Sequence, residues 1–193
     1  MRNTSMKIGK TRIRVVRGSM LEQKTDVVVN AAKCSLRGGG GIDGMIHKAA
    51  GSQLDLYELK QFPDGTTTGV PVITPSFNMP HKAIIHVPGP VWTGGINDEP
   101  ALLKLAYVNS IALADLWKYT SIAFCSISTG IYGFPLDKGA EIAIKYIAEW
   151  CEWHAHDANI KTVVFAMYGE EEYNMFLKAL RAEKRRRKRG ILE

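Results

Sequence analysis

Short apolar runs alternate along the chain with longer segments whose apolar positions repeat every three to four residues, a pattern typical of α/β proteins. The short runs are rich in β-branched residues and predict six strands, at residues 13–17, 26–30, 70–74, 83–87, 121–127 and 162–167. The longer segments predict helices over about 97–118 and 137–154, with weaker helices after Asp43 and from about Glu170 onward. The pattern therefore predicts one three-layer α/β domain with a central sheet of about six strands.

Length and composition agree with a single folded domain and exclude several other classes of protein. The chain has 193 residues, of which 46% are hydrophobic, enough to bury a core without disulfides or metals. The three cysteines are far apart and form no CxxC pair, which excludes a disulfide scaffold and a zinc ribbon. No apolar run approaches the roughly 18 residues of a membrane helix, and the N-terminus lacks the apolar stretch of a signal peptide. We therefore expect a cytoplasmic protein without contact with membranes.

The positive charge of the chain is concentrated at its C-terminal end. The formal net charge is +6, and residues 181–193 contribute +5 of it through seven basic and two acidic residues. We therefore divide the chain into a domain over 1–180, which is close to neutral, and a basic tail over 181–193, which like-charge repulsion is expected to fray. Two interpretations of the tail stay open: a solvated helix end, or an electrostatic arm for RNA or another polyanion.

A glycine-rich loop follows the strand predicted at 26–30. Four consecutive glycines occupy residues 38–41, just before the predicted start of a helix near Asp43. Glycines let the backbone approach a ligand closely, and a helix N-terminus favours an anion such as phosphate. A flexible surface loop is the alternative. The spacing G-x-G-x-x-G also occurs at 39–44, but it does not follow the strand directly, so we do not interpret it as a dinucleotide fingerprint.

A second loop, rich in small hydroxyl residues and glycine, follows the strand predicted at 121–127. It runs from Ser126 to Pro135. Backbone N–H groups in such a loop can form a nest for a diphosphate, and Tyr132 and Phe134 offer flat faces for a sugar or a base. Ligands of α/β proteins bind at the carboxyl ends of the strands. The two loops therefore predict a cleft for a phosphate-bearing ligand.

Candidate catalytic side chains lie in and beside the first loop. Asp43 and His47 are four residues apart at the start of a helix, so they share a face. A carboxylate there can hold and polarise water, and an imidazole can orient the carboxylate or relay a proton. The alternative is a helix-capping Asp with a half-buried His. Asn30, at the end of a strand, offers an amide to a hydroxyl group or is simply a turn residue.

Other reactive residues carry weaker signals. His154 and His156 lie at the end of an amphipathic helix, and no third ligand is evident, which argues against a metal site. Cys34 lies in the first loop, but nothing in the sequence identifies a base partner for a thiol nucleophile. We therefore expect neither a metal nor a cofactor.

Together, the two loops resemble those of the macrodomain family, and within it the MacroD-type branch. The resemblance covers about residues 11–180. It rests on four stretches of sequence: VNAA at 29–32, GGGGIDG at 38–44 followed by His47 and AAG at 49–51, HVPGPVW at 86–92, and ISTGIYGF at 127–134. The resemblance implies an α/β/α fold around a mixed sheet that binds ADP-ribose and often hydrolyses an ester at its distal ribose.

The resemblance also implies roles for individual residues. Asp43 would be the catalytic carboxylate, with His47 as its helper and Asn30 at the distal ribose. The glycine loop would follow the distal ribose and the diphosphate, the second loop would wrap the diphosphate, and Tyr168 would stack on adenine. The binding residues that the resemblance implies are Ser19, Met20, Lys33, Gly38, Gly39, Gly40, Gly41, Ile42, Ser128, Thr129, Gly130, Ile131, Tyr132, Gly133, Phe134 and Tyr168.

Two positions depart from the pattern of the family. The family usually has Gly-Asp-Ile after its first strand, where the Asp accepts a hydrogen bond from the adenine amino group, but here Ser19 follows Gly18. A charge-assisted bond of roughly 1.5–3 kcal/mol would then be missing. The family also usually has Asn where Lys33 stands, near the distal ribose. A cation there can attract phosphate, lower the pKa of Asp43 or obstruct the pocket.

Three functions from different classes stay open at this point. The first is a hydrolase that removes acetyl from O-acetyl-ADP-ribose, or ADP-ribose from acidic side chains of ADP-ribosylated proteins; Asp43 with His47 favours it. The second is a reader that binds ADP-ribose without chemistry, which Ser19 and Lys33 favour. The third is a nucleic-acid or protein-interaction module that uses the basic tail. We expect a monomer.

Overall fold

The sheet at the centre of the fold is mixed, because its two outermost strands run antiparallel to their neighbours. A computed structural model describes residues 4–190 of the chain. The strands in this range are β1 (Ser5–Ile8), β2 (Thr11–Arg17), β3 (Val27–Ala32), β4 (Val72–Pro75), β5 (Ala83–Pro88), β6 (Ser121–Phe124) and β7 (Thr162–Met167). They are ordered β1-β2-β7-β6-β3-β5-β4. β1 pairs antiparallel with β2 and β4 with β5, whereas the inner strands pair in parallel.

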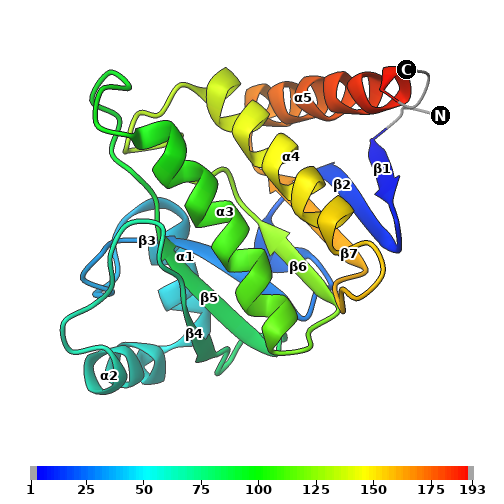
Figure 1. Ribbon diagram of the computed structural model, residues 1–193. Coiled ribbons are helices and arrows are strands. Elements are labelled where there is room, and N and C mark those ends of the chain that lie inside the picture. Colours follow the sequence, from blue (N-terminus) through cyan, green and yellow to red (C-terminus); the bar gives the residue numbers. More distant parts are fainter. Residues whose placement is uncertain (1–3, 191–193) are drawn as a thin grey trace.

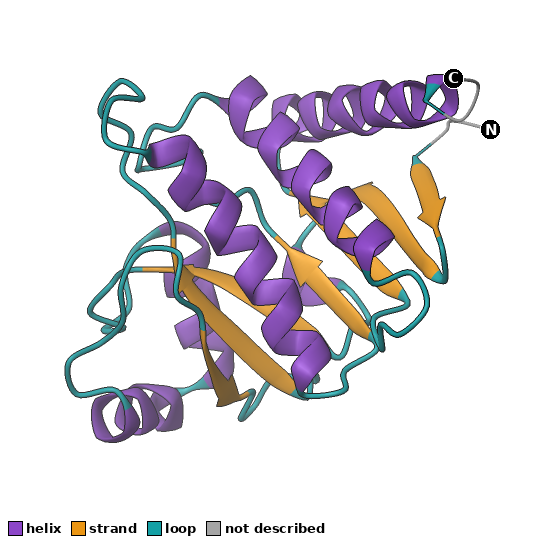
Figure 2. Ribbon diagram, in the orientation of Figure 1, coloured by secondary structure: helices purple, strands orange, loops and turns teal. Residues whose placement is uncertain are grey.

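Helices cover both faces of this sheet (Figures 1 and 2). They are α1 (Gly41–Ala50), α2 (Ser52–Gln61), α3 (Glu99–Leu116), α4 (Leu136–Trp153) and α5 (Glu170–Arg189), with a short 3-10 turn, η1, at Met20–Glu22. In Figure 1, α3 and α4 lie in front of the sheet, α1 lies behind it, and α2 lies at the lower left beside the edge strand β4. The fifth helix packs along α4 and contacts β2 and β7. The expected three-layer α/β/α fold is confirmed.

Two inner strands, β3 and β5, show why the sheet is buried between helices. Val27, Val28 and Val29 are each 0% exposed, and all six residues of β5 are buried. A parallel strand that is covered on both faces reads as a continuous apolar run rather than an alternating one. His86 and Asn30 are the polar exceptions in this buried pair, and they face each other in register.

The sheet has one more strand than the approximately six expected, and several strand boundaries differ by one to three residues. β1 was missed because it has only four residues and carries Lys7 on its exposed side. β6 ends at Phe124 rather than at residue 127. Beyond Phe124 the Ile127 N–H donates to the Tyr107 hydroxyl, at 2.9 Å, instead of to a carbonyl oxygen of a neighbouring strand. β4 begins at Val72 rather than at residue 70.

The C-terminal segment takes the form of a helix as far as it is described. α5 continues without a break across residue 181, where the basic tail was expected to begin, and ends at Arg189; residues 191–193 lie outside the described range. Arg187 pairs with Glu152 of α4 at 2.9 Å and with Glu183 at 2.7 Å. The pair with Glu152 joins α5 to α4, whereas the pair with Glu183 lies within α5. None of the described helices is long and apolar enough to cross a membrane.

Candidate active site

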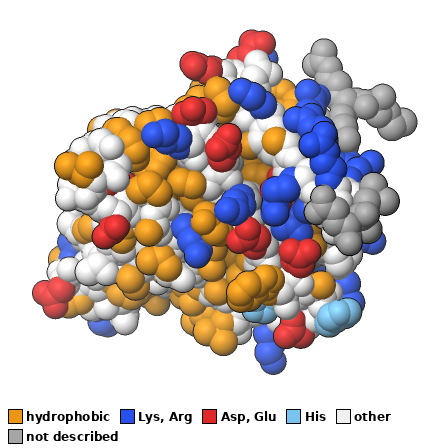
Figure 3. Space-filling view, turned by 45° about the horizontal axis from the view of Figure 1, so that its top comes forward, with side chains coloured by type: hydrophobic (Ala, Val, Ile, Leu, Met, Phe, Trp, Pro, Cys, Tyr) orange, Lys and Arg blue, Asp and Glu red, His pale blue; other side chains and the backbone are white. Residues whose placement is uncertain are grey.

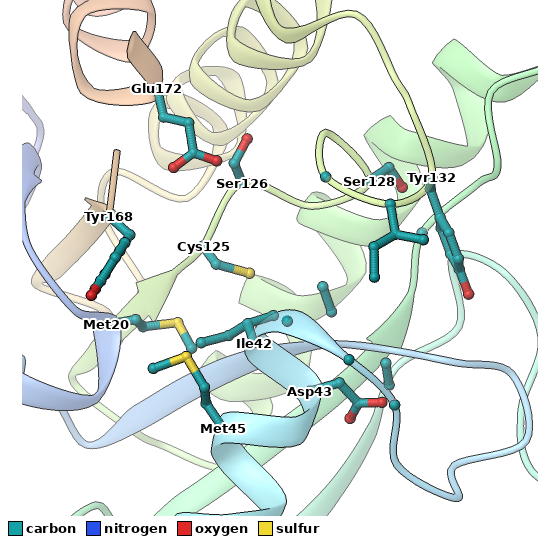
Figure 4. Close-up of a pocket in the computed structure, with 18 of the residues that line it drawn as sticks. Met20, Ile42, Asp43, Met45, Cys125, Ser126, Ser128, Tyr132, Tyr168 and Glu172 are labelled. Carbon is teal, nitrogen blue, oxygen red and sulfur yellow. The ribbon is translucent and has the colours of Figure 1, made fainter. Parts of the chain in front are cut away.

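A cavity of about 510 Å³ opens at the carboxyl ends of the parallel strands (Figure 4). Its wall comes largely from the segments that follow β2, β3, β6 and β7, which are far apart in the chain but adjacent in the sheet. This is the position at which α/β sheets bind ligands. The two loops that the sequence singles out, after β3 and after β6, therefore border one cavity.

Most of the predicted binding residues lie in the cavity wall. Those that reach it are Ser19, Met20, Lys33, Gly39, Gly40, Gly41, Ile42, Asp43, Ser128, Gly130, Ile131, Tyr132 and Tyr168. The predicted residues outside the wall are Asn30, Gly38, His47, Thr129, Gly133 and Phe134. Phe134 is buried, and its ring lies edge-on to Trp92 with the centroids 4.7 Å apart. Phe134 therefore supports the second loop from the side that faces away from the cavity.

Several wall residues were not assigned to the site from the sequence. They are Gly18, Ala31, Ala32, Met45, Gly89, Cys125, Ser126, Ala166, Gly169 and Glu172. The helical period would have indicated Met45, because it follows Ile42 by three residues on one side of α1. Glu172 lies in the first turn of α5, directly after the last parallel strand, which is a comparable signal.

Asp43 lies in the first turn of α1, at the wall of the cavity. Its Oδ1 accepts a 2.7 Å hydrogen bond from Nδ2 of Asn30, which is buried inside β3 rather than in a turn. Its Oδ2 is buried and has no hydrogen-bond partner among the described residues. The N-cap of the helix is Gly40, so Asp43 is not the cap. One carboxylate oxygen is thus held by the protein, and the other, though buried, has no partner among the described residues.

Two glycines let the loop pass close to this carboxylate. A Cβ on Gly39 would lie 2.9 Å from Asp43 Oδ2 and 3.0 Å from Lys33 Cε. A Cβ on Gly44 would lie 2.6 Å from the carbonyl oxygen of Gly39. The distances to Asp43 Oδ2 and to the Gly39 carbonyl oxygen are shorter than close packing permits. Glycine at these positions therefore allows Lys33 and Asp43 to flank the same turn of the loop.

His47 follows Asp43 by one helical turn and contacts it from behind. Its Nε2 lies 3.3 Å from Asp43 Oδ1, and its Nδ1 lies 2.6 Å from Asp55 Oδ1. The hydrogen bond to Asp43 raises the pKa of His47 to about 9; burial of the ring opposes this shift, and the contact with Asp55 adds to it. Burial alone would raise the pKa of Asp43, but hydrogen bonds from His47 and Asn30 hold it below its ordinary value. At neutral pH the pair is an ionised carboxylate beside an imidazolium.

The second loop faces the first across the cavity. Ile131 is 84% exposed, and its Cδ1 lies 3.4 Å from the position of a Cβ on Gly40. Ser128 adopts a left-handed backbone conformation, with φ at 67°, and its buried Oγ has no partner among the described residues. A Cβ on Gly89 would collide with that Oγ. The two loops therefore approach each other closely at Ile131 and Gly40, whereas the Ser128 hydroxyl is buried against Gly89.

The other end of the cavity carries apolar groups, next to the carboxylate of Glu172. Figure 4 shows Met20, Met45 and the ring of Tyr168 grouped there, away from Asp43 and Tyr132. Tyr168 follows β7 and is 76% exposed, so its ring face is available for stacking. Ser19 Oγ accepts the N–H of Leu21 at 3.2 Å and caps the 3-10 turn, which gives this departure from the family pattern a local structural role.

One group of side chains behind Asp43 has the composition of a metal site. Potential ligand atoms of His47, Asp55 and Glu58 lie within 4.8 Å of one another. Asp55 contacts the Nδ1 edge of the imidazole, whereas Glu58 lies 3.5 Å from Nε2 at the opposite edge. A single ion cannot bind the same ring through both nitrogens. The arrangement therefore fits an ion-paired imidazolium better than a metal centre.

Comparison with known proteins agrees with this geometry. The "O-acetyl-ADP-ribose deacetylase" of Escherichia coli K12 is 44% identical over 173 residues, which is 89% of this chain and 96% of that protein. The "Macro domain-containing protein TTE0995" of Caldanaerobacter subterraneus is 41% identical over 172 residues, covering 88% and 96% of the two chains.

Solved structures give the same result. The Oceanobacillus iheyensis macrodomain with ADP superposes with a TM-score of 0.88 at 33% identity, over 94% of this chain and 96% of that chain. The Trypanosoma brucei macrodomain in complex with ADP-ribose gives 0.79 at 34% identity, over 87% and 68%. The family model "Macro domain" matches residues 29–143, which include both loops of the site. The chain therefore belongs to the macrodomain family.

Proposed function

We propose that this protein binds ADP-ribose in the cavity and hydrolyses an ester on the distal ribose, with O-acetyl-ADP-ribose as a substrate. Relatives at 44% identity carry the name of that deacetylase, and related macrodomains have been solved with ADP and ADP-ribose. The observation that carries the proposal is the Asp43 carboxylate, which presents an unpartnered Oδ2 at the cavity wall while Asn30 holds Oδ1.

The shape of the cavity favours one orientation of the ligand. Adenine suits the apolar end, where the exposed Tyr168 ring can stack on it. The diphosphate suits the gap between the two glycine-bearing loops, beside the N-terminus of α1, because a helix N-terminus favours anions. The distal ribose then lies at Asp43. Lys33, in the same wall, is placed to attract a phosphate oxygen.

The proposed reaction consumes one water molecule. Asp43 Oδ2 accepts a hydrogen bond from the water and orients it toward the carbonyl carbon of the ester. Water oxygen forms a bond to that carbon, the bond from carbon to the ribose oxygen breaks, and the ribose oxygen gains the proton that the water loses. The products are the free acid and ADP-ribose. The imidazolium of His47 stabilises the negative charge of Asp43 throughout.

The same chemistry extends the proposal to ADP-ribosylated proteins. An Asp or Glu side chain joined to the distal ribose is also a carboxylate ester, so Asp43 can serve the same role. Proteins with ADP-ribosylated acidic side chains are the partners that this extension names.

We also propose a cytoplasmic location for the protein. The three cysteines of the chain are free thiols, which supports this location.

The experiment that tests the proposal combines binding with two hydrolysis assays. Calorimetry measures the affinity for ADP-ribose, with adenosine as the control that lacks the diphosphate and the distal ribose. Acetate release from O-acetyl-ADP-ribose and ADP-ribose release from a protein modified on Glu are then followed with the same enzyme. Binding without release of either product would identify a reader rather than a hydrolase.

A second candidate function uses the basic end of α5. Arg181, Arg185, Lys188 and Arg189 are exposed and follow the helical spacing that places them on one side. Figure 3 shows Lys and Arg side chains gathered near this end of the helix. Arg187 is held by acidic partners and does not contribute. We propose that this side of α5 binds RNA or another polyanion.

A further inference from the structure

A buried polar pair lies behind Asp43 and does not reach the cavity. Glu58 of α2 and His86 of β5 are both 0% exposed, and Glu58 Oε1 lies 3.1 Å from His86 Nδ1. Glu58 Oε2 lies 3.5 Å from His47 Nε2. Neither oxygen of Glu58 has a hydrogen bond of good geometry among the described residues. An ionised carboxylate in this situation is costly, so its protonation state has to be accounted for.

The hydrogen bonds of His86 fix which of its nitrogens carries the proton. Thr74 Oγ1 donates to the carbonyl oxygen of Pro75 at 3.0 Å, so it accepts from His86 Nε2 at 2.9 Å. The Nδ1 atom then carries a lone pair. Asn30 Nδ2 lies 3.1 Å from that lone pair and donates to it, while the same amide group donates to Asp43 Oδ1 at 2.7 Å.

This assignment leaves one place for the proton of the pair. An ionised Glu58 would set a lone pair of Oε1 against the lone pair of Nδ1, whereas a proton on Oε1 makes the contact attractive. Burial is the main cause in both residues: it raises the pKa of Glu58 to about 7 and lowers the pKa of His86 to about 3. Among the surrounding charges, His47 and Arg37 oppose the shift of Glu58, and Asp43 and Asp55 reinforce it.

We propose that Glu58 is held as a neutral carboxylic acid and serves as a positioning residue for Asp43. Protonated Glu58 and the Asn30 amide share the Nδ1 lone pair of His86 as donors, which holds the ring and the amide in place, and the second amide hydrogen of Asn30 donates to Asp43. An ionised Glu58 would instead place a second carboxylate behind the site and compete with Asp43 for the Nε2–H of His47. The catalytic consequence rests on the proposed function; the protonation of Glu58 does not.

Infrared spectroscopy tests the protonation without any substrate. In mildly acidic buffer the wild-type protein is expected to show the C=O stretching band of a protonated carboxyl group that is absent from Glu58→Gln. The band should fade as the pH is raised through about 7. Glu141→Gln is the matched control, because Glu141 is an exposed carboxyl group on α4, and it should leave the band unchanged. A spectrum with no such difference would overturn the proposal.

Two substitutions test the positioning role. In Glu58→Gln the side-chain amide replaces the O–H donor, so the pKa of Asp43, followed by carbon-13 NMR, and kcat should stay close to wild type. In Glu58→Leu the donor is lost, the pKa of Asp43 should rise, and kcat should fall by about 10-fold or more, because small displacements of a catalytic group are costly. The Kd for ADP-ribose should stay unchanged in both, since Glu58 is not in the wall.

The outcomes separate the two proposals. Equal effects of Gln and Leu on the Asp43 pKa would refute the positioning role, whether or not the protein hydrolyses esters. Absence of ester hydrolysis in the wild type would refute the proposed function, while the infrared and NMR results would still decide the state and role of Glu58.

Discussion

The Asn30 amide lies 2.7 Å from Asp43 Oδ1, although the two residues are 13 positions apart and belong to different elements. Asn30 is fixed within β3, and Asp43 is fixed by the first turn of α1. The glycine loop joins β3 to α1. It has to bring Asp43 back beside the strand without filling the space next to the carboxylate. The orientation of Asp43 therefore depends on the rigid strand rather than on the loop.

Loss of the Asp43 carboxylate should abolish most of the turnover. We expect Asp43→Ala to lower kcat by about 100-fold or more, because it removes the group that orients water, while the Kd for ADP-ribose changes little. Acetate release and calorimetry measure the two quantities. Asp64→Ala, in an exposed segment after α2, is the control. Unchanged turnover in Asp43→Ala would remove this residue from the mechanism, and loss of wild-type activity with a chelator would show that a metal is required.

His47 should make the stability of the protein depend on pH. Its pKa in the folded protein, about 9, lies above the ordinary value of 6.5, so the protonated form stabilises the fold. This contribution is fully present below pH 6.5 and is lost as the pH rises through about 9. Chemical denaturation over this range should show a decline in the free energy of unfolding that is absent from His47→Gln. A decline of equal size in both proteins would contradict the assignment.

Ionisation of Glu58 should cause a separate decline in the free energy of unfolding at lower pH, and this second decline provides a control for the one assigned to His47. Its pKa is raised from 4.5 to about 7, so stability falls as the pH rises between these values. Glu58→Gln should remove this lower decline and leave the upper one.

Restoring the acidic residue at position 19 should strengthen the recognition of adenine. Ser19 caps the 3-10 turn through its Oγ, and Asp is an equally good cap, so Ser19→Asp keeps the local structure and adds a charged acceptor. We expect ADP-ribose to bind about 10-fold more tightly, the equivalent of about 1.4 kcal/mol. Ser19→Asn, which caps without the charge, is the matched control. Weaker binding in Ser19→Asp would mean that this end of the cavity suits another base.

Removing the cation at position 33 should raise the rate of hydrolysis. Lys33 Cε and Asp43 Oδ2 both lie near Gly39, so the ammonium group shares the space where substrate and water meet. Lys33→Asn keeps a polar side chain and should raise kcat with O-acetyl-ADP-ribose. Lys33→Arg keeps the charge and serves as the control. A lower kcat in Lys33→Asn would show that Lys33 assists the reaction, for example by holding phosphate.

Binding of a polyanion to α5 should depend on salt and on four side chains. Each neutralised phosphate contributes about −0.9 to the log–log slope, so four contacts predict a slope of about −4 on duplex nucleic acid. Replacing the four exposed cations Arg181, Arg185, Lys188 and Arg189 with Gln should abolish it and leave ADP-ribose binding unchanged. The control replaces four exposed lysines elsewhere: Lys24, Lys48, Lys60 and Lys118. Equal losses of polyanion binding in both variants would show that net charge, rather than this side of α5, determines binding.

The sequence predicts the layers, the two loops and the Asp43–His47 pair because each leaves a local signal. Strands and helices follow apolar periods, and a spacing of four residues places two side chains on one helix face. Asp43 and His47 do lie together, at 3.3 Å. The edge strand β1 lacks such a signal, since four residues with one exposed lysine read equally well as a loop.

Glu58 and His86 could not be found in the same way. Glu58 occupies a helix with polar residues on most sides, where a glutamate normally faces solvent. Its burial follows only from the packing of α2 against β4 and its contact with His86 of β5. His86 belongs to a stretch that marks the family, but its partners come from three other elements. Contacts between residues this far apart in the sequence leave no recognisable pattern within any single segment of the chain.

The Tyr107 hydroxyl makes the second loop separable from the sheet. Because this side chain of α3, rather than a neighbouring strand, receives the Ile127 N–H, the segment beyond it is free of the strand ladder. It is held instead by the Trp92 N–H, which donates to the Tyr132 carbonyl oxygen at 2.8 Å, and by the buried Phe134. Exposed residues of this loop, such as Ile131, can therefore differ between homologues without disturbing strand register, whereas Phe134 is fixed by the core. Selectivity for the ligand's diphosphate and sugar can thus diversify at these exposed positions while the order and pairing of the strands stay the same.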